Sequence, residues 1–313
     1  MPLADPSRPS ELVAPGGRVY HLGLAPGELA ERVVLVGDPA RALKVAARFD
    51  TVRHEVRRRE YVTLTGTYRG EEVSVIGTGI GTDNVEIALV EAHAVHAHDL
   101  ETGRRRPDAR PLTFIRVGTS GGAQDDHPPG ALAISAYALG LDSTGLFYEG
   151  PPADEIVLEL ERQAAKVLAA GVQPGSRFRG ALRPYASMAD PVWVGALQQA
   201  ARRADQPYAT GVTGTLPGFY APSGRHIEGL RCTLPDLKAR LGTLRIGDLR
   251  LLNFEMESSL LFHLAGQLGH AAATVCAVIS APGTHGSVVD YKPAVEAAID
   301  LTLNALVVGP HTD

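Results

Sequence analysis

The chain has 313 residues, of which 44% are hydrophobic and 21% are charged, which is enough apolar material for one large domain or two small ones. Its formal net charge of -5 at pH 7 gives no general attraction for nucleic acid or for an anionic membrane, so any anion must be bound by a few placed residues. We therefore expect neither nucleic acid nor a membrane as a partner.

Two features of the chain bear on where it works. Cys232 and Cys276 stand in no CxxC or Cys/His pattern, which argues against a disulfide scaffold and a structural zinc site and fits a cytoplasmic location. Residues 1–17 are rich in Pro and Gly without an apolar segment, so they are typical of a loose tail rather than a signal peptide or an anchor. We predict one catalytic domain, residues 18–313, after this tail.

Strand patterns alternate with helix patterns in chain order. The β-branched run 32–36 precedes a helix pattern that begins at Pro39, and the strand pattern of 71–79 leads through glycines into apolar positions at helical spacing over 83–99. The later predicted strands are 112–118, 130–139 and 271–280, and the later predicted helices are 154–170, 190–204, 255–268 and 290–307.

This alternation predicts an α/β fold whose sheet is covered by helices on both faces, with ligands bound at the carboxyl ends of the strands. The stretches 101–111 and 220–242 are rich in turn formers and are interpreted as excursions from the sheet. No internal repeat or low-complexity linker divides the chain, which favours a single domain.

The stretch "GTGIGTDN", residues 77–84, joins a predicted strand to a predicted helix. It has neither the GxGxxG spacing of a dinucleotide turn nor the GK[ST] ending of a phosphate loop. Two interpretations are therefore open: a loop that contacts a ligand, or a tight connection in which Asp83 or Asn84 is the helix N-cap.

In three separate stretches, interpreted as strand ends, an arginine accompanies small or flexible residues. These arginines are Arg41 after Gly37, Arg59 in "RREY", and Arg116 shortly before Thr119. A guanidinium makes forked contacts with phosphate, and backbone amides and a Thr hydroxyl add further donors. Any one of these arginines alone is more often a surface residue, but the set indicates an oxyanion site.

Two carboxylates, Glu255 and Glu257, precede an apolar helix pattern. On a helix they would point about 200° apart, so they are not a glycosidase-like pair on one face. One of them can cap the helix. A single carboxylate that faces a pocket is the usual partner of a sugar diol, and it needs a cation beside it when it is buried.

An ordered set of motifs resembles the nucleoside phosphorylase I family, and above all its uridine phosphorylases: "HLGL" (21–24), "VGDPAR" (36–41), "REY" (59–61), "GTGIG" (77–81), "IRVGTSGG" (115–122), "GFYAPSGR" (218–225) and "NFEMES" (253–258). The resemblance spans roughly positions 20 to 305. It implies a single-domain nucleoside phosphorylase-like α/β fold with a mixed, partly barrel-like sheet flanked by helices. It also implies a homo-oligomer built from dimers, commonly a hexamer, and the cleavage of a nucleoside by inorganic phosphate into free base and ribose 1-phosphate.

The resemblance further implies a role for each matching residue. Phosphate binding falls to Gly37, Arg41, Arg116, Thr119 and, from the neighbouring subunit, Arg59. Ribose binding falls to the backbone of Met256, to Glu257 and to the neighbour's His21, and base binding falls to Phe219, Ser223 and Arg225. Arg116, Arg225 and Glu257 are the expected catalytic residues: Arg116 would hold the nucleophile, Arg225 would stabilise the departing base and Glu257 would bind the ribose. No metal or cofactor is implied, and phosphate is the co-substrate.

The departures from the family pattern concern the base. Purine members carry an Asp after the last core strand, whereas this chain has Ala281 and Pro282 there and no carboxylate until Asp290. Ser223 replaces a base-reading Gln, and Pro282 replaces an Arg of the uridine enzymes. We expect a pyrimidine nucleoside phosphorylase that serves nucleoside catabolism and pyrimidine salvage.

Three other functions stay open at this point: a purine nucleoside phosphorylase of the same fold, a nucleoside hydrolase of the same fold, and a non-catalytic nucleoside-binding protein. The retained Arg41, Arg116 and Thr119 argue against the hydrolase, and Glu257 with Arg225 argues against the non-catalytic protein.

Overall fold

The computed structural model describes residues 13–14, 16–282 and 290–309 of the chain, and a mixed 11-stranded sheet lies at its centre. In sheet order the strands are β11 (Arg245–Ile246), β12 (Leu249–Glu255), β10 (Tyr208–Thr215), β8 (Leu132–Gly140), β13 (Ala271–Ser280), β7 (Thr113–Gly122), β3 (Arg32–Val36), β6 (Glu71–Gly77), β5 (Tyr61–Tyr68) and β4 (Thr51–Arg58), with β9 (Tyr185–Met188) paired to β8.

Part of this sheet closes on itself. The end of β12 pairs with the end of β7, with Asn253 opposite Gly122 and Phe254 opposite Gly121. Strands β12, β10, β8, β13 and β7 thereby form a small barrel, and β3, β6, β5 and β4 extend from it as an open wing. The predicted fold class, an α/β fold with a mixed and partly barrel-like sheet, is confirmed.

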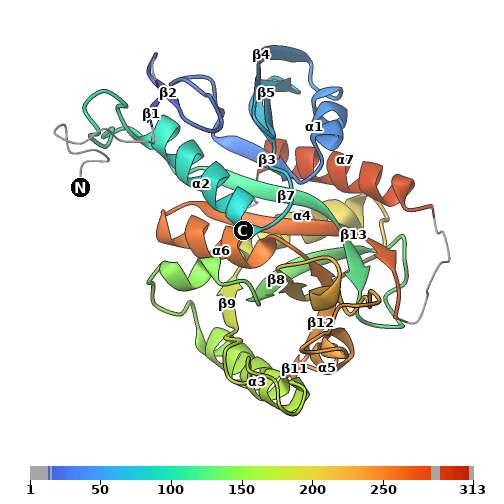
Figure 1. Ribbon diagram of the computed structural model, residues 1–313. Coiled ribbons are helices and arrows are strands. Elements are labelled where there is room, and N and C mark those ends of the chain that lie inside the picture. Colours follow the sequence, from blue (N-terminus) through green and yellow to red (C-terminus); the bar gives the residue numbers. More distant parts are fainter. Residues whose placement is uncertain (1–12, 15, 283–289, 310–313) are drawn as a thin grey trace.

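Helices flank both sides of this sheet. They are α1 (Pro39–Ala46), α2 (Thr82–Ala97), α3 (Glu155–Gly171), α4 (Pro191–Arg203), α5 (Leu237–Leu241), α6 (Ser258–Gln267) and α7 (Lys292–Val308), with short 3₁₀ turns η1 (Thr144–Phe147) and η2 (Ala221–Ser223). Helix α2 packs on α6 and α4 packs on α7, and the two pairs lie on either side of β7 and β13 (Figure 1).

The strand directions explain why the predicted phosphate ligands come together. Strands β6, β3 and β7 run parallel to one another, so their carboxyl ends meet at one edge of the sheet. Gly37 follows β3, residues 78–81 follow β6, and Thr119 lies near the end of β7. Long apolar runs form the middle strands because both of their faces are covered.

Several element predictions are confirmed, and others are wrong. The strands predicted at 32–36 and 271–280 have those bounds, but the helix predicted at 255–268 begins only at Ser258, because β12 continues through Glu255. The hairpin of β4 and β5 was not predicted. Its outer strand is mostly exposed and polar, so it lacks the apolar alternation on which the prediction depended.

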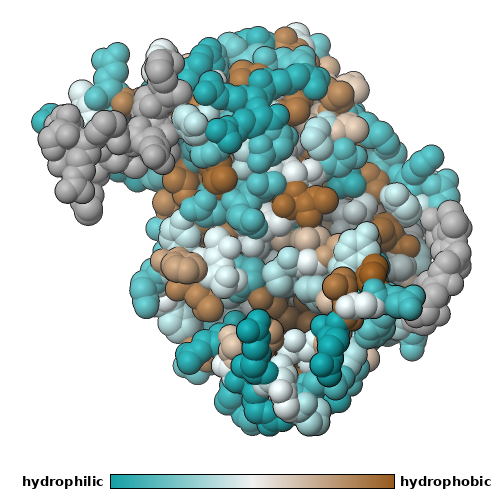
Figure 2. Space-filling view, in the orientation of Figure 1, coloured by the Kyte–Doolittle hydropathy of each residue, from teal (hydrophilic) through white to brown (hydrophobic). Residues whose placement is uncertain are grey.

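At the start of the described chain, β1 (Val13–Ala14) pairs antiparallel with β2 (Arg18–Val19). Residues 1–12 and 15 of the predicted tail lie outside the described residues, and the division into a tail, 1–17, and a domain, 18–313, stays a prediction. No helix within residues 13–14, 16–282 and 290–309 is both long and apolar enough to cross a membrane. Figure 2 shows a mostly hydrophilic face with apolar residues gathered across its middle.

Candidate active site

A cavity of about 780 Å³ opens where β3, β6 and β7 end and where β12 closes the barrel. The predicted site residues that line it are Gly37, Arg41, Arg116, Thr119, Phe219, Ser223, Arg225, Met256 and Glu257. His21 and Arg59 do not line it. A smaller cavity of about 490 Å³, between β9 and α6, holds none of the predicted residues. The larger cavity is therefore the candidate active site.

Arg41 reaches this cavity because α1 begins directly after β3. Asp38 is the N-cap of α1, and its Oδ1 accepts from the Ala40 amide at 2.8 Å, which places Arg41 in the first turn. The Arg41 Nη1 donates to the Val117 carbonyl at 3.2 Å. Burial, together with nearby Arg116, lowers the pKa of Arg41. An anion bound between the two guanidinium groups would relieve their repulsion.

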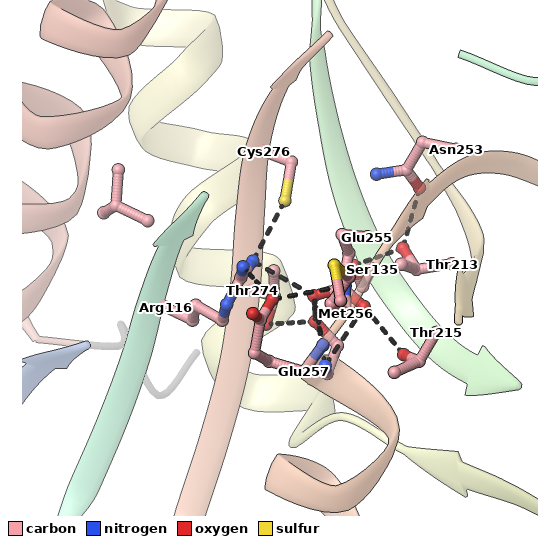
Figure 3. A network of polar contacts seen from close by, with 12 residues as sticks. Arg116, Ser135, Thr213, Thr215, Asn253, Glu255, Met256, Glu257, Thr274 and Cys276 are labelled. Carbon is pink, nitrogen blue, oxygen red and sulfur yellow. Dashed lines mark hydrogen bonds and ion pairs between the residues drawn. The ribbon is translucent and has the colours of Figure 1, made fainter. Parts of the chain in front are cut away.

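Arg116 is buried in a network with two carboxylates (Figure 3). Its Nη1 lies 3.1 Å from Glu255 Oε2, and its Nη2 donates to Glu257 Oε2. Burial disfavours the charged guanidinium, but the Glu257 and Glu255 carboxylates outweigh burial and raise the pKa of Arg116. Arg116 is thus a fixed positive charge before any ligand binds.

The arrangement of the two carboxylates corrects the expectation that they point about 200° apart, because both contact Arg116. That expectation assumed a helix, whereas Glu255 ends β12 and Glu257 is the N-cap of α6. Glu255 also accepts from the Thr215 hydroxyl at 2.7 Å and from the Ser258 amide at 3.1 Å. Glu255 therefore holds the Arg116 guanidinium in place, a role that the sequence interpretation missed.

The glycine-rich loop contributes directly to the site. The Gly81 amide donates to Glu257 Oε1 at 2.9 Å, and Gly79 and Ile80 line the cavity. Burial raises the pKa of the Glu257 carboxyl, although Arg116 opposes the shift. The loop also starts α2, so it is a strand-to-helix connection that lines the cavity, and its contact with a ligand stays a prediction.

The N-cap prediction for this loop is wrong. The N-cap of α2 is Gly81, with φ of 99° and no side-chain cap bond, rather than Asp83 or Asn84. Glycine takes this positive φ without the strain that another side chain would suffer. The Asn84 side chain instead donates to the Ile80 carbonyl at 3.3 Å.

The opposite wall of the cavity comes from the segment around η2. The guanidinium carbon of Arg225 lies 3.8 Å from the ring centroid of Phe219, and its Nη1 donates to the Phe219 carbonyl at 2.7 Å. The Ser223 hydroxyl donates to the Gly218 carbonyl at 3.0 Å. Phe219 is 54% exposed, so this wall carries an exposed aromatic residue.

Lys238 of α5 also lines this wall, and the sequence interpretation missed it. Its Nζ lies 5.2 Å from the ring centroid of Phe254. The surrounding stretch, 220–242, showed only turn formers, and no local pattern marks a residue that tertiary packing carries to a cavity. Within the described residues, no group of three or more His, Cys, Asp and Glu side chains could hold a metal ion.

His21 and Arg59 lie together outside the cavity. The Arg59 Nη2 donates to the Tyr20 hydroxyl at 3.1 Å, and its guanidinium carbon lies 5.0 Å from the Tyr20 ring centroid. His21 Nδ1 lies 2.7 Å from Glu91 Oε1. Neither residue can serve its own chain's cavity in this arrangement, so their predicted roles depend on a second subunit.

Comparison with known proteins places the chain in a family. Residues 31–306 match the family described as the phosphorylase superfamily. The chain belongs to this superfamily. The match covers β3 through most of α7, and therefore every predicted site residue except His21.

Individual members of the phosphorylase superfamily resemble the chain to different extents. The uridine phosphorylase of Thermococcus kodakarensis is 32% identical over 267 residues, which are 84% of this chain and 78% of the relative. The purine nucleoside phosphorylase of Geobacillus kaustophilus is 38% identical over 112 residues, only 34% of this chain and 40% of the relative.

Among solved structures, the chain resembles a nucleoside phosphorylase of Trypanosoma brucei, described as showing uridine phosphorylase activity. The TM-score is 0.82 at 29% identity, with 95% of this chain and 99% of that chain covered. The match to the Thermococcus kodakarensis uridine phosphorylase extends over most of the chain, whereas the match to the Geobacillus kaustophilus purine nucleoside phosphorylase covers about a third of it. The predicted family resemblance is confirmed.

Proposed function

We propose that this protein cleaves the N-glycosidic bond of a pyrimidine nucleoside such as uridine with inorganic phosphate, giving free base and ribose 1-phosphate. One observation carries the proposal: Arg41, Arg116, Thr119 and Glu257 line the same cavity. Two guanidinium groups with adjacent donors suit a phosphate anion, and a fixed carboxylate suits a sugar diol. The uridine phosphorylase of Thermococcus kodakarensis and the Trypanosoma brucei structure support this assignment.

The reaction follows from the charges in the cavity. Phosphate binds at Arg41 and Arg116 with the Gly37 backbone and the Thr119 hydroxyl, and Glu257 and the Met256 backbone bind the ribose. The bond from C1′ to the base breaks with its electron pair on the base, and a phosphate oxygen bonds to C1′. The fixed arginines align the nucleophile, and this alignment can lower the barrier by several kcal/mol.

The base leaves at the Phe219 and Arg225 wall. Arg225 stabilises the negative charge on the departing base, and Ser223 faces its edge. Arg116, Arg225 and Glu257 are thus the proposed catalytic residues. Phosphate is the co-substrate in this scheme, and no step in it requires a cofactor.

Completion of the site by a second subunit is part of the proposal. His21 and Arg59 lie on one surface beside Tyr20, where a neighbouring cavity could receive them. A dimer is then the smallest active unit, and a hexamer is the expected assembly. We place the enzyme in the cytoplasm, in nucleoside catabolism and pyrimidine salvage, and its two free cysteines, Cys232 and Cys276, suit a reducing compartment.

A purine nucleoside is the second candidate substrate, because the Geobacillus kaustophilus relative is a purine nucleoside phosphorylase. The deciding experiment incubates the protein with uridine, thymidine, inosine and adenosine, with and without phosphate, and measures released base and ribose 1-phosphate. We expect base release only with phosphate, and most rapidly from uridine. Equal rates in phosphate-free buffer would contradict a phosphorylase.

Arg41 gives the cleanest variant for this test. Arg116→Ala would leave the buried Glu255 and Glu257 carboxylates unpaired, at a cost of about 3 to 5 kcal/mol, so lost activity could reflect unfolding. Among the described residues, the Arg41 guanidinium bonds only a backbone carbonyl, and Arg41→Ala should lower kcat/KM for phosphate by about a hundredfold in a folded protein. Arg48→Ala is the control, and it should keep activity. Arg48 lies just after α1 and pairs with Glu296.

A further inference from the structure

Phe219, Ser223 and Arg225 form the wall of the cavity at which the base is proposed to bind. This base wall carries a second positive charge besides Arg225. Lys238 lies on α5, is half-buried, and lines the cavity beside Phe254. Its Nζ is 3.6 Å from the position that a β-carbon on Gly121 would take. The ammonium is therefore held at the point where β7 and β12 close the barrel, where Gly121 pairs with Phe254.

The other cations of the cavity already have partners in the chain. Arg116 is held by two carboxylates, Arg41 donates to the Val117 carbonyl, and Arg225 donates to the Phe219 carbonyl. Within the part of the chain that the structure describes, Lys238 Nζ makes no hydrogen bond or ion pair. An ammonium carries three donors, and Nζ is therefore available to an acceptor bound in the cavity.

The positive charge near Lys238 favours the binding of a negatively charged acceptor beside it. Burial, and after it the nearby Arg225 guanidinium, lower the pKa of Lys238 to about 8. The other charged residues that line the cavity are Asp38, Arg41, Glu60, Arg116, Glu255 and Glu257. Two adjacent cations without an anion repel one another, so negative charge on a ligand between them lowers the energy of both.

We propose that Lys238 contacts the base directly, that its ammonium binds a carbonyl oxygen of the pyrimidine, and that it stabilises the negative charge on the departing base. The inference rests on the proposed function. As the C1′–N1 bond breaks, its electron pair moves to the base and spreads over the ring carbonyl oxygens. Lys238 and Arg225 bind those oxygens, and a proton from water later neutralises the released base.

This pair of cations also defines a substrate class. Bases with carbonyl edges that leave as anions, such as uracil and thymine, are favoured at the wall. A base that must be protonated before it leaves, such as adenine, is disfavoured because two cations repel it. Lys238 thus contributes to base selection in a way that Ser223 and Arg225 alone do not.

The test uses Lys238→Met, Lys238→Arg and a matched control in the same helix. Methionine keeps most of the side-chain length without the charge, and arginine keeps the charge. Arg240→Met is the control, because Arg240 lies two residues further along α5, pairs with Asp236 at 2.7 Å and does not line the cavity. The substrates are uridine and 5-fluorouridine, whose fluorine makes the departing base a more stable anion.

We expect Lys238→Met to lower kcat/KM for uridine by about 10- to 100-fold, the range for a lost hydrogen bond to a charged group. The loss for 5-fluorouridine should be smaller, because its base depends less on the ammonium. Lys238→Arg should restore most of the activity, and Arg240→Met should resemble the unmodified protein.

The pH profile gives an independent measurement. The protonated lysine is the active form, so kcat/KM for uridine should fall as pH rises through about 8 in the unmodified protein. In Lys238→Arg this fall should move to higher pH, because a guanidinium stays charged there. Thermal unfolding of each variant shows whether it is folded. If Lys238→Met does not fold, the pH profile of Lys238→Arg tests the role of Lys238: a fall of kcat/KM that moves to higher pH supports it, and an unmoved fall contradicts it.

The outcomes separate the inference from the function on which it rests. Unchanged uridine kinetics in Lys238→Met would overturn the role of Lys238. Equal losses for uridine and 5-fluorouridine, with the fall of kcat/KM at the same pH in Lys238→Arg, would overturn it too. Either result would leave the phosphorylase assignment standing. An unmodified protein that releases no base from any nucleoside with phosphate overturns the proposed function and the inference together.

Discussion

The guanidinium of Arg116 occupies the space that a side chain on Gly118 would need. A β-carbon on residue 118 would lie 2.1 Å from Arg116 Nη1 and 2.8 Å from Cys276 Sγ. A guanidinium at the end of a flexible side chain can often move aside. Here it is buried and held by Glu255 and Glu257, so moving it would break the network around it.

Gly118→Ala should therefore displace Arg116 from the phosphate. We expect kcat/KM to fall by about a hundredfold, since an error of about 1 Å in a positioning group has that effect. We also expect a loss of about 1 to 3 kcal/mol in the free energy of unfolding from overpacking. Steady-state kinetics and urea unfolding measure the two effects.

Gly195→Ala is the matched control for this substitution. Gly195 lies inside α4, and a β-carbon there meets nothing within 4 Å. Alanine at this position should raise the free energy of unfolding by about 0.5 to 1 kcal/mol and leave kinetics unchanged. Full activity in Gly118→Ala would show that Arg116 does not need its present position.

The predicted residues that the structure brings to one cavity include some for which local pattern and chain order suffice. Gly37, Arg41 and Thr119 follow or end parallel strands, and parallel strands bring their carboxyl ends together. Glu255 was misplaced because β12 and α6 are both apolar. A short apolar run does not show by its periodicity where a strand ends and a helix begins.

Other features depend on contacts between distant segments, which no local pattern contains. The closure of the barrel pairs Phe254 with Gly121, residues far apart in the chain. Lys238 reaches the cavity because α5 packs beside that closure. The proposed roles of His21 and Arg59 require a second subunit, because both residues lie outside the cavity of their own chain.

The shared site can be tested by mixing inactive variants. A His21→Ala/Arg59→Ala protein should lack the groups that it lends to its neighbour, and an Arg41→Ala protein should lack its own phosphate ligand. Refolding the two together at equal amounts should restore up to about a quarter of the unmodified activity, because half of random dimers are mixed and each has one intact site.

The control uses an Arg57→Ala protein in place of the His21→Ala/Arg59→Ala protein. Arg57 pairs with Glu55 on the same exposed strand and does not line the cavity. A protein that carries Arg57→Ala alone should be active as its own homo-oligomer, without mixing with the Arg41→Ala protein. Absence of any restored activity in the mixture, or a fully active monomer by light scattering, would contradict a site built by two subunits.

Stability should depend on pH through a pair of buried histidines. The His270 Nδ1 accepts from the Leu112 amide at 3.0 Å, so its proton is on Nε2, which lies 2.9 Å from His93 Nδ1. Burial lowers the pKa of His93 from 6.5 to about 4 and that of His270 to about 3, and after burial His98 adds to the shift of His93 and His93 adds to the shift of His270. Both are neutral in the folded protein at pH 7.

The sign of the pH effect follows from these shifts. Below pH 6.5 the unfolded chain binds more protons than the folded one, so stability falls as pH falls. We expect the free energy of unfolding to be highest above pH 6.5 and to decrease towards pH 4. His93→Gln removes one of the titrating groups and should make this decrease shallower, while substitution of the exposed His226 by Gln should not. Parallel curves for the unmodified protein and His93→Gln would contradict the assignment.

The choice of base depends on position 223. The Ser223 hydroxyl already donates its proton to the Gly218 carbonyl at 3.0 Å, so it can offer a base only a lone pair. A glutamine there would add both a donor and an acceptor for the uracil edge. A correctly formed hydrogen bond of this kind is worth about 1 to 3 kcal/mol, so Ser223→Gln should raise kcat/KM for uridine by about tenfold.

Ser223→Ala is the companion variant, and it should change uridine kinetics little, because the hydroxyl is already bonded within the chain. Lower activity in Ser223→Gln than in Ser223→Ala would show that the wall has no room for the longer side chain. The decisive comparison uses the unmodified enzyme with inosine and uridine. Ala281 and Pro282 follow β13 and offer no acid to protonate a purine, so uridine should have the higher kcat/KM. If inosine is the better substrate, the pyrimidine assignment is wrong, and the proton must come from another carboxyl at the cavity, such as Asp38 or Glu60.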